Sequence, residues 1–313
     1  MVERIKGIRI EGNQSASDLV GQMRFAGLQA SELGKAVEVI REMKKEKATV
    51  ILTFTSNMVS SGLRELFAQL CEEKFVDAVI TSIGSVEEDL IKTQKPFLLG
   101  DFNSNDARLH KVGINRIGNI LVPNDRYVWL EKFLQPFFKK ELEKQRKMER
   151  LLAPNELIRD LGLSLKDKNS FVFQCAKNDI PVFCPAPTDG AFGLQLFFFK
   201  QDHPEFGIDV SGDLKPLGDK VILSKKTGGI ILGGGFAKHH AIGANILRGG
   251  FDYAVYVSTA SEYDGSLSGA KTKEAVSWGK IKEKGKTAYV EGDASIIFPL
   301  MMAGVVRLPV SFY

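Results

Sequence analysis

The sequence predicts an α/β fold, a single large Rossmann-like domain with a mostly parallel sheet and helices on both faces. Short runs rich in β-branched residues alternate with segments of helical periodicity along the chain. Strands separated by helices are typical of parallel sheets that are covered on both sides. Several of these runs end in small polar or glycine-rich turns, and open α/β sheets bind their ligands at such strand ends.

The predicted elements follow each other without a break in composition, which favours one α/β domain over residues 15–313 rather than two. Residues 1–14 contain two glycines and an asparagine, and we expect them to form an N-terminal arm. In chain order we expect strands at 48–54, 76–81, 182–184, 230–232, 253–257 and near 287–290, and helices at 17–43, 59–73, 127–152, 155–161, 170–177, 238–247 and 296–306.

Two successive strands each lead into a small polar turn. Thr55-Ser56-Asn57 follows the first strand and Ser82-Ile83-Gly84-Ser85 the second. Backbone N–H groups and hydroxyls at the helix N-termini that follow bind phosphates readily. We expect the acidic run Glu87-Glu88-Asp89 to begin the second helix. These carboxylates either favour the positive end of that helix or face a cationic ligand.

A glycine triplet, Gly233–Gly235, follows a later buried strand. Glycine allows a close backbone approach or a positive φ, so the triplet is either a packing turn or part of a ligand site. It is not the usual dinucleotide fingerprint. Together with the two polar turns it predicts a nucleotide site. His239 and His240 open the next helix, where one could pack or cap and one could act as a general base. No third ligand stands at metal-binding spacing, so we expect no metal.

The stretch from Glu274 to Lys280 combines a carboxylate, Trp278, a glycine and a lysine. A tryptophan face attracts cations, and a lysine whose free amine is favoured by a ligand-lined site is a nucleophile. The alternative is a surface lysine beside a packing tryptophan.

Composition excludes several classes of protein. The net charge of +4 gives no clustered basic face for nucleic acid. The longest apolar runs are too short to cross a bilayer, and the N-terminus lacks the apolar core of a signal peptide. Three cysteines at no metal-ligand spacing read as reduced thiols. We therefore expect a cytoplasmic protein that binds neither nucleic acid nor membranes.

Eleven segments spread along the chain match one known family, namely 55–62, 84–91, 113–119, 121–124, 181–183, 188–190, 230–235, 238–240, 252–256, 274–280 and 293–295. Through them nearly the whole chain resembles deoxyhypusine synthase, in an archaeal-type form. The resemblance implies that NAD takes a hydride from spermidine, that diaminopropane leaves, and that the aminobutyl group passes through an imine on an enzyme lysine to a lysine of the translation factor 5A precursor. It also implies a homotetramer with active sites at subunit interfaces.

The resemblance also assigns site residues. It implies that Lys280 is the covalent nucleophile and His239 the base. It implies that Glu274 pairs with an ammonium and that Trp278 stacks on the polyamine, with Glu87 and Glu88 on the same substrate. The implied NAD contacts are Ser56, Asn57, Ser60, Ser82, Gly84, Glu88, Asp189, Gly234, Ser258, Thr259, Asp293 and Ala294.

Two positions depart from the family pattern. Leu194 and Leu267 stand where the better-known eukaryotic members carry aspartates that hold the polyamine. A leucine accepts no hydrogen bond, so the amine is held differently. Two alternatives to the main function are an enzyme like homospermidine synthase, which transfers to a free diamine, and a non-catalytic NAD-binding protein.

Overall fold

The computed structural model describes residues 3–305 and confirms the α/β class with parallel strands. The chain divides into two compact units, residues 1–54 with 218–313 and residues 55–217, which we call unit 1 and unit 2 and describe separately. Residues 3–14 form no helix or strand. Within 3–305, no helix is both long enough and apolar enough to cross a lipid bilayer.

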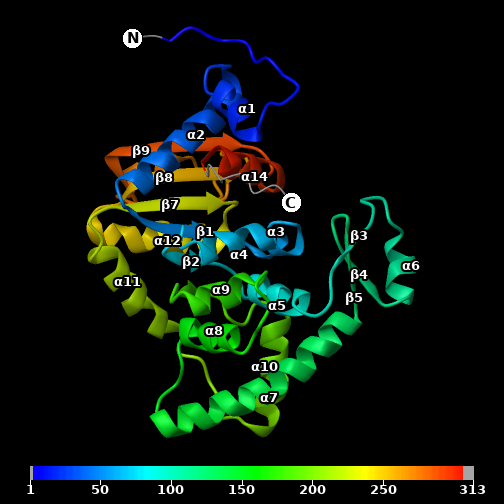
Figure 1. Cartoon of the computed structure of the whole chain (residues 1–313). Coiled ribbons are helices and arrows are strands. Elements are labelled where there is room, and N and C mark those ends of the chain that lie inside the picture. The colour runs from blue at the N-terminus through cyan, green and yellow to red at the C-terminus, as the bar shows by residue number, and fades with distance from the viewer. Residues whose placement is uncertain (1–2, 306–313) are drawn as a thin grey trace. The chain divides into compact units, whose positions relative to one another are not determined.

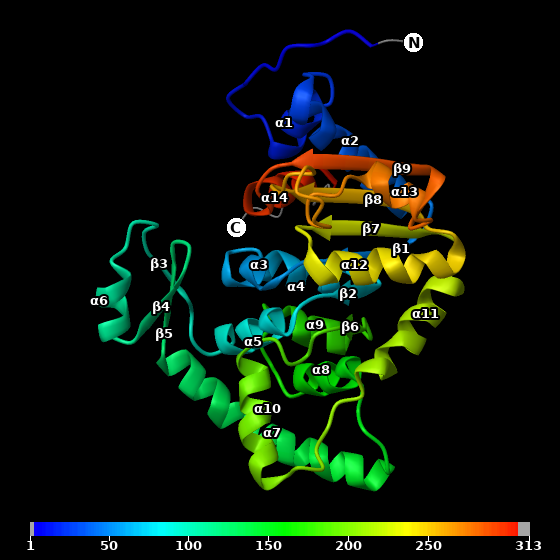
Figure 2. The same ribbon diagram turned by 180° about the vertical axis from the view of Figure 1, so that it is seen from behind.

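Unit 1 is built on four parallel strands in the order β1-β7-β8-β9. Helices α2 and α14 cover one face of this sheet, with α1 packed against both of them, and α12 and α13 cover the other face (Figures 1 and 2). The elements are α1 (Ala16–Met23), α2 (Leu28–Lys45), β1 (Thr49–Thr53), β7 (Thr227–Leu232), α12 (Gly235–Ala244), η2 (Asn245–Arg248), β8 (Phe251–Ser258), α13 (Thr272–Ser277), β9 (Ile281–Glu291) and α14 (Ala294–Val305), and α11 (Leu214–Ile222) runs across the boundary between the units.

The register of this sheet brings its carboxyl ends to one edge. Leu232 of β7 pairs with Val257 of β8, and Ser258 pairs with Glu291 of β9. The opposite half of the sheet is closely covered by α2. A Cβ on Gly228 would lie 2.4 Å from the sulfur of Met43, so only glycine lets this helix pack so near β7.

Unit 2 contains a parallel pair of strands, β2 and β6. It also contains a separate antiparallel sheet in the order β3-β5-β4, and helix α6 contacts strand β4 of that sheet (Figure 1). Its elements are α3 (Ser56–Ser60), α4 (Arg64–Glu72), β2 (Ala78–Ile80), α5 (Ile83–Lys92), β3 (Leu98–Leu99), α6 (Asp106–Lys111), β4 (Ile114–Ile117), β5 (Ile120–Pro123), α7 (Asp125–Met148), α8 (Pro154–Leu163), α9 (Phe171–Lys177), β6 (Val182–Phe183), α10 (Ala191–Asp202) and η1 (Val210–Asp213).

A buried ionic group joins helices α4, α5 and α9 of unit 2. The guanidinium of Arg64 donates to Asp89 at 2.6 Å and to Asp167 at 2.7 Å. The second oxygen of Asp89 accepts from the Ser170 hydroxyl and from the Val172 amide. Asp89 and Arg64 are almost inaccessible to solvent, so each charge depends on the other for compensation.

Four expectations about elements were wrong. The histidine pair was expected to open a helix at residue 238, but α12 begins at Gly235, so both histidines lie inside the helix. The helix expected over 17–43 is two helices, because Gly27 takes φ +85 and the chain reverses there. The helix expected from residue 59 begins at 56 and is broken before Arg64. Glu87-Glu88-Asp89 do not begin a helix. The side chain of Ser82 caps α5 at its true start, which leaves the three acids buried in the middle of that helix.

Candidate active site

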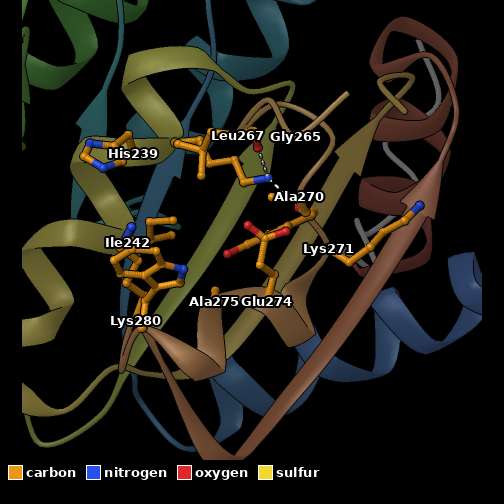
Figure 3. A pocket seen from close by; sticks show the side chains of 12 residues that line it. His239, Ile242, Gly265, Leu267, Ala270, Lys271, Glu274, Ala275 and Lys280 are labelled. Atoms are coloured by element: carbon orange, nitrogen blue, oxygen red, sulfur yellow. Dashed lines mark hydrogen bonds between the residues drawn. The ribbon is translucent and has the colours of Figure 1, made fainter. Parts of the chain in front are cut away.

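A pocket of about 240 Å³ lies in unit 1 between α12, the loop 259–271 and α13 (Figure 3). Four residues to which the sequence assigned a role in binding or catalysis line it, namely His239, Glu274, Trp278 and Lys280. Leu267, one of the two departures from the family pattern, lines it as well. The pocket is smaller than the roughly 300–1,000 Å³ of sites for drug-sized ligands, and it suits a slender chain.

Lys280 lies just beyond α13, where Gly279 takes φ +65 and turns the chain so that the Lys280 amide donates to the carbonyl of Ala275. Its side chain is only 9% exposed. The Nζ atom lies 5.1 Å from the centroid of the Trp278 ring, and it has no hydrogen bond or ion pair with any residue in 3–305. A lysine amine that is held but not paired can present its lone pair to an electrophile.

Glu274 supplies the carboxylate of the pocket. It lies in the first turn of α13, and its side chain forms no ion pair with the part of the chain that the structure describes. Trp278 follows four residues later, so the two side chains lie on the same helical face. A free carboxylate beside an aromatic face is an arrangement that binds an ammonium.

The two histidines of α12 have different surroundings. His239 is exposed and lines the pocket, where Figure 3 shows its ring. His240 is half-buried, and its Nε2 atom has no hydrogen-bond partner in the described chain. Burial, and secondarily the neighbouring His239, lowers the pKa of His240, so this ring stays neutral at pH 7.

Sequence reasoning missed two further residues of the pocket. Lys238 is buried, and its ammonium donates to the carbonyls of Leu267 and Ala270, both at 2.7 Å. Tyr256 of β8 is also buried, and its hydroxyl has no partner among the described residues. Lys238 stands beside the histidine pair in sequence, but nothing in the sequence shows that it turns inward.

The carboxyl edge of the unit 1 sheet brings together five of the predicted NAD contacts, Gly234, Ser258, Thr259, Asp293 and Ala294. Gly233 donates to the carbonyl of Val257 at 2.8 Å, and Gly292 to that of Ser258 at 3.1 Å. Gly234 is also a packing position, because a Cβ there would lie 2.4 Å from the Cα of Ser268. The triplet therefore packs against the loop 259–271 as well as ending a strand.

A second group of predicted residues comes together in unit 2, around α3 and α5. A Cβ on Gly84 would lie 3.0 Å from the Cβ of Ser56, next to the Ser82 hydroxyl. The hydroxyl of Ser60 donates to the carboxyl of Glu88. Asn57 and Asp189 are exposed nearby in the same unit.

The two glutamates of α5 have raised pKa values. Burial is the main cause for both, and it raises the pKa of Glu88 to about 8. Glu87 accepts from the backbone amides of Ala191 and Phe192, at 3.1 and 2.6 Å. These amides lie at the start of α10, so Glu87 holds that helix N-terminus.

Both groups of residues have the chemistry of a dinucleotide site. Hydroxyls and helix N-termini suit phosphates, and carboxylates at strand ends suit ribose hydroxyls. In unit 1, the N-cap position of α12 is Gly234, which has no side chain to cap the helix, and the neighbouring Gly235 amide donates to the Ser268 hydroxyl. The structure thus fits NAD in each unit taken by itself.

The chain is similar in sequence to one family over most of its length. The family model for deoxyhypusine synthase matches residues 18–305. A protein of Pyrococcus abyssi described as a probable deoxyhypusine synthase is 45% identical, over 97% of this chain and 96% of its own. A protein of Halobacterium salinarum with the same description is 46% identical, over 97% of this chain and 92% of its own.

Solved structures agree with this similarity. A crystal structure from Entamoeba histolytica described as that of a putative deoxyhypusine synthase matches with a TM-score of 0.72 and 28% identity, over 96% of both chains. A complex of AgrE with ornithine and NAD+ matches with a TM-score of 0.54 at 12% identity, over 91% of this chain and 34% of that one. The second match shows a common fold alone.

Proposed function

The chain belongs to the deoxyhypusine synthase family, and on this premise we propose that it transfers the aminobutyl group of spermidine to one lysine of the translation factor 5A precursor. The observation that carries the proposal is the pocket of unit 1. In it, the amine of Lys280, the carboxylate of Glu274 and the face of Trp278 line one cavity, and neither charged group has an ion pair within residues 3–305.

The proposed roles follow from these surroundings. Glu274 and Trp278 hold an ammonium of the amine donor, and Lys280 attacks the carbon that becomes electrophilic. His239 lies on the pocket wall, within α12, and takes a proton from the amine. Lys280 itself is buried, which limits the water that could reach an imine formed on its amine.

We assign NAD as the cofactor. Bound NAD would supply the acceptor, and later the donor, of a hydride. The proposed contacts that belong to unit 1 are Gly234, Ser258, Thr259, Asp293 and Ala294. Those that belong to unit 2 are Ser56, Asn57, Ser60, Ser82, Gly84, Glu88 and Asp189. Two observations support this assignment. The proposed contacts of unit 1 lie together at the carboxyl edge of its sheet, and those of unit 2 lie around α3 and α5.

Replacement of the nucleophile tests the proposal. Lys280→Arg is expected to abolish the covalent enzyme–aminobutyl intermediate and to leave NAD binding intact, because a guanidinium is not a nucleophile at neutral pH. The measurement is borohydride trapping of labelled spermidine on the protein, with NAD titrated separately. Lys271→Arg is the matched control, since Lys271 also lines the pocket but its ammonium lies over the Tyr289 ring. Normal transfer by Lys280→Arg would remove Lys280 from the mechanism.

The fate of the label separates the main proposal from its alternatives. Purified protein is incubated with NAD, labelled spermidine and the factor precursor. Label on a lysine of the precursor supports deoxyhypusine formation. Label only in a free polyamine supports an activity like that of homospermidine synthase. If no diaminopropane is released, the chain is a non-catalytic NAD-binding protein.

We also propose that the chain acts as a homotetramer with active sites at subunit interfaces. What supports this is the apolar side of α10, where Leu194, Phe197 and Phe198 are each at least half exposed. Such a patch on a soluble protein marks an interaction site. Light scattering after size exclusion is expected to give four times the 34.6 kDa of one chain, and a monomer mass would contradict the proposal.

A further inference from the structure

Lys238 contributes a fixed positive charge to the wall of the pocket. An ammonium has three hydrogens to donate. Two of them go to the carbonyls of Leu267 and Ala270, and the Nζ atom lies 4.5 Å from the centroid of the Tyr256 ring. Figure 3 shows the bonds to the loop as dashed lines. Because the protein itself binds this ammonium, its charge stays in place when a ligand enters.

The same bonds hold an apolar surface against the ligand. They fix the main chain of the loop 259–271 on either side of Ser268, and they place Leu267 on the pocket wall together with Ile242. Neither side chain can accept a hydrogen bond from an ammonium. A charged nitrogen against this surface would lose its hydration without compensation.

The charged groups that face the pocket are unbalanced in sign. Among the described residues that line it, Glu274 on α13 is the single carboxylate and three are lysines. The lysines are Lys238 from α12, Lys271 from the loop and Lys280 beyond α13. The other titratable side chains in the lining are those of His239 and Tyr256. The pocket therefore offers compensation for one ligand ammonium.

We infer that this pocket holds an aliphatic amine by one ammonium only, at Glu274 and Trp278, and that Lys238 keeps a second nitrogen of the bound amine uncharged. A neighbouring cation disfavours protonation of an amine. The buried Tyr256 hydroxyl, which has no partner in residues 3–305, is available to an uncharged nitrogen. Burial lowers the pKa of Lys238 to about 8, so the residue is still mainly charged at pH 7.

The inference rests on the proposed function and adds a reason for its chemistry. Bound NAD would accept a hydride from carbon, and the lone pair of the adjacent nitrogen would then form the new C=N bond. A protonated nitrogen has no lone pair to give, so the uncharged form is the one that reacts. Lys238 would thus select the reactive form of the donor, while Glu274 holds its charged end.

Two simple amines test the inference. Binding of n-butylamine and of 1,4-diaminobutane to the full-length protein with NAD is measured by calorimetry between pH 6 and 7.5. The affinity for the diamine is expected to rise about tenfold per pH unit relative to butylamine, because one nitrogen must lose its proton. Butylamine reports any titration of the pocket itself. Equal pH dependence of the two amines, or tighter diamine binding at pH 6, overturns the inference.

Variants locate the effect. Lys238→Met removes the charge at similar length and is expected to reduce the extra pH dependence of the diamine, because the apolar wall at Leu267 and Ile242 still disfavours an ammonium. Leu267→Asp supplies a second carboxylate to that wall and is expected to abolish the extra pH dependence without disturbing the lysine, whereas Leu267→Asn keeps the wild-type pattern. If Leu267→Asp also keeps the wild-type pattern, the inference is wrong.

A transfer assay on the wild-type protein distinguishes failure of the proposed function from failure of the inference about the uncharged nitrogen. If neither amine binds and no aminobutyl group is transferred, the proposed function fails and the inference fails with it. If transfer occurs while the diamine binds with both nitrogens charged, the inference alone fails.

Discussion

At the scale of single residues, two neighbouring buried carboxyl groups of α5 differ in their surroundings. One forms a structural ion pair, and the other can interact with a ligand. Asp89 is buried with a full set of partners, including Arg64. Glu88, its neighbour on α5, has the Ser60 hydroxyl, and burial raises its pKa to about 8. A carboxyl that stays protonated near neutral pH can donate a hydrogen bond to a ligand, which an ionised one cannot.

The raised pKa of Glu88 predicts a pH dependence of stability. The unfolded carboxyl ionises near its ordinary value of about 4.3. Because the pKa in the folded protein is higher, the carboxyl contributes fully to folding stability only below the unfolded pKa. This contribution is lost as pH rises through about 8. Glu88→Gln is expected to flatten the fall in Tm of the NAD-free protein between pH 5 and 8. Parallel curves for the two proteins would show that Glu88 ionises normally.

At the scale of elements, close packing identifies the structural role of a glycine for which the sequence left two interpretations. The glycine triplet had two interpretations, and the structure gives Gly234 a packing contact with Ser268 at the end of β7. The amide of Gly235 also donates to the Ser268 hydroxyl at 3.1 Å. The loop 259–271 thus rests on the start of α12.

Two glycines of unit 1 provide a matched test of this packing. Gly234→Ala places a methyl group 2.4 Å from the main chain of Ser268, so it is expected to destabilise the protein by about 1–3 kcal/mol and to weaken amine binding. Gly243→Ala, near the end of α12, meets nothing within 4 Å and is expected to raise stability by up to about 1 kcal/mol. Thermal unfolding and butylamine titration of both variants measure this. Equal stability of the two would show that the loop does not press on Gly234.

The ion pair between α4 and α5 predicts a large loss. Asp89→Ala leaves the buried guanidinium of Arg64 without its main partner, and the expected cost is about 3–5 kcal/mol in free energy of unfolding. The exposed pair Arg146–Glu205 is the control, because Glu205→Ala is expected to cost no more than about 1 kcal/mol. Urea denaturation of both variants gives the comparison, and similar losses would contradict it.

Elements with a clear period were predictable, and their boundaries often were not. The strand expected over 48–54 is β1, and the long helix expected from residue 127 is α7. The antiparallel sheet of β3, β5 and β4 was not predicted, because its strands have two to four residues. In such short strands no alternation can develop. The break at Gly27 depends on a tertiary contact, since a Cβ on Gly34 would collide with the main chain of Arg24.

At the scale of the whole molecule, the chain is one sequence with two compact units. Steady alternation of strands and helices favoured a single domain over 15–313, and that organisation stays a prediction. Four pocket residues were named from the sequence because they stand in short, chemically distinctive stretches. Lys238 and Tyr256 were missed because their importance depends on packing. Lys238 is buried and donates two hydrogen bonds to the loop, and the buried Tyr256 hydroxyl has no partner among the described residues.

Trp278 gives this pocket an optical signal of its own. The chain has two tryptophans, and Trp129 lies in α7, stacked on Phe133. The indole of Trp278 is 66% exposed, beside the amine of Lys280. With Trp129 replaced by phenylalanine, intrinsic fluorescence would report from the pocket alone. Arrival of an amine at Glu274 could then be followed on a stopped-flow time scale, in unlabelled protein and apart from the chemical step.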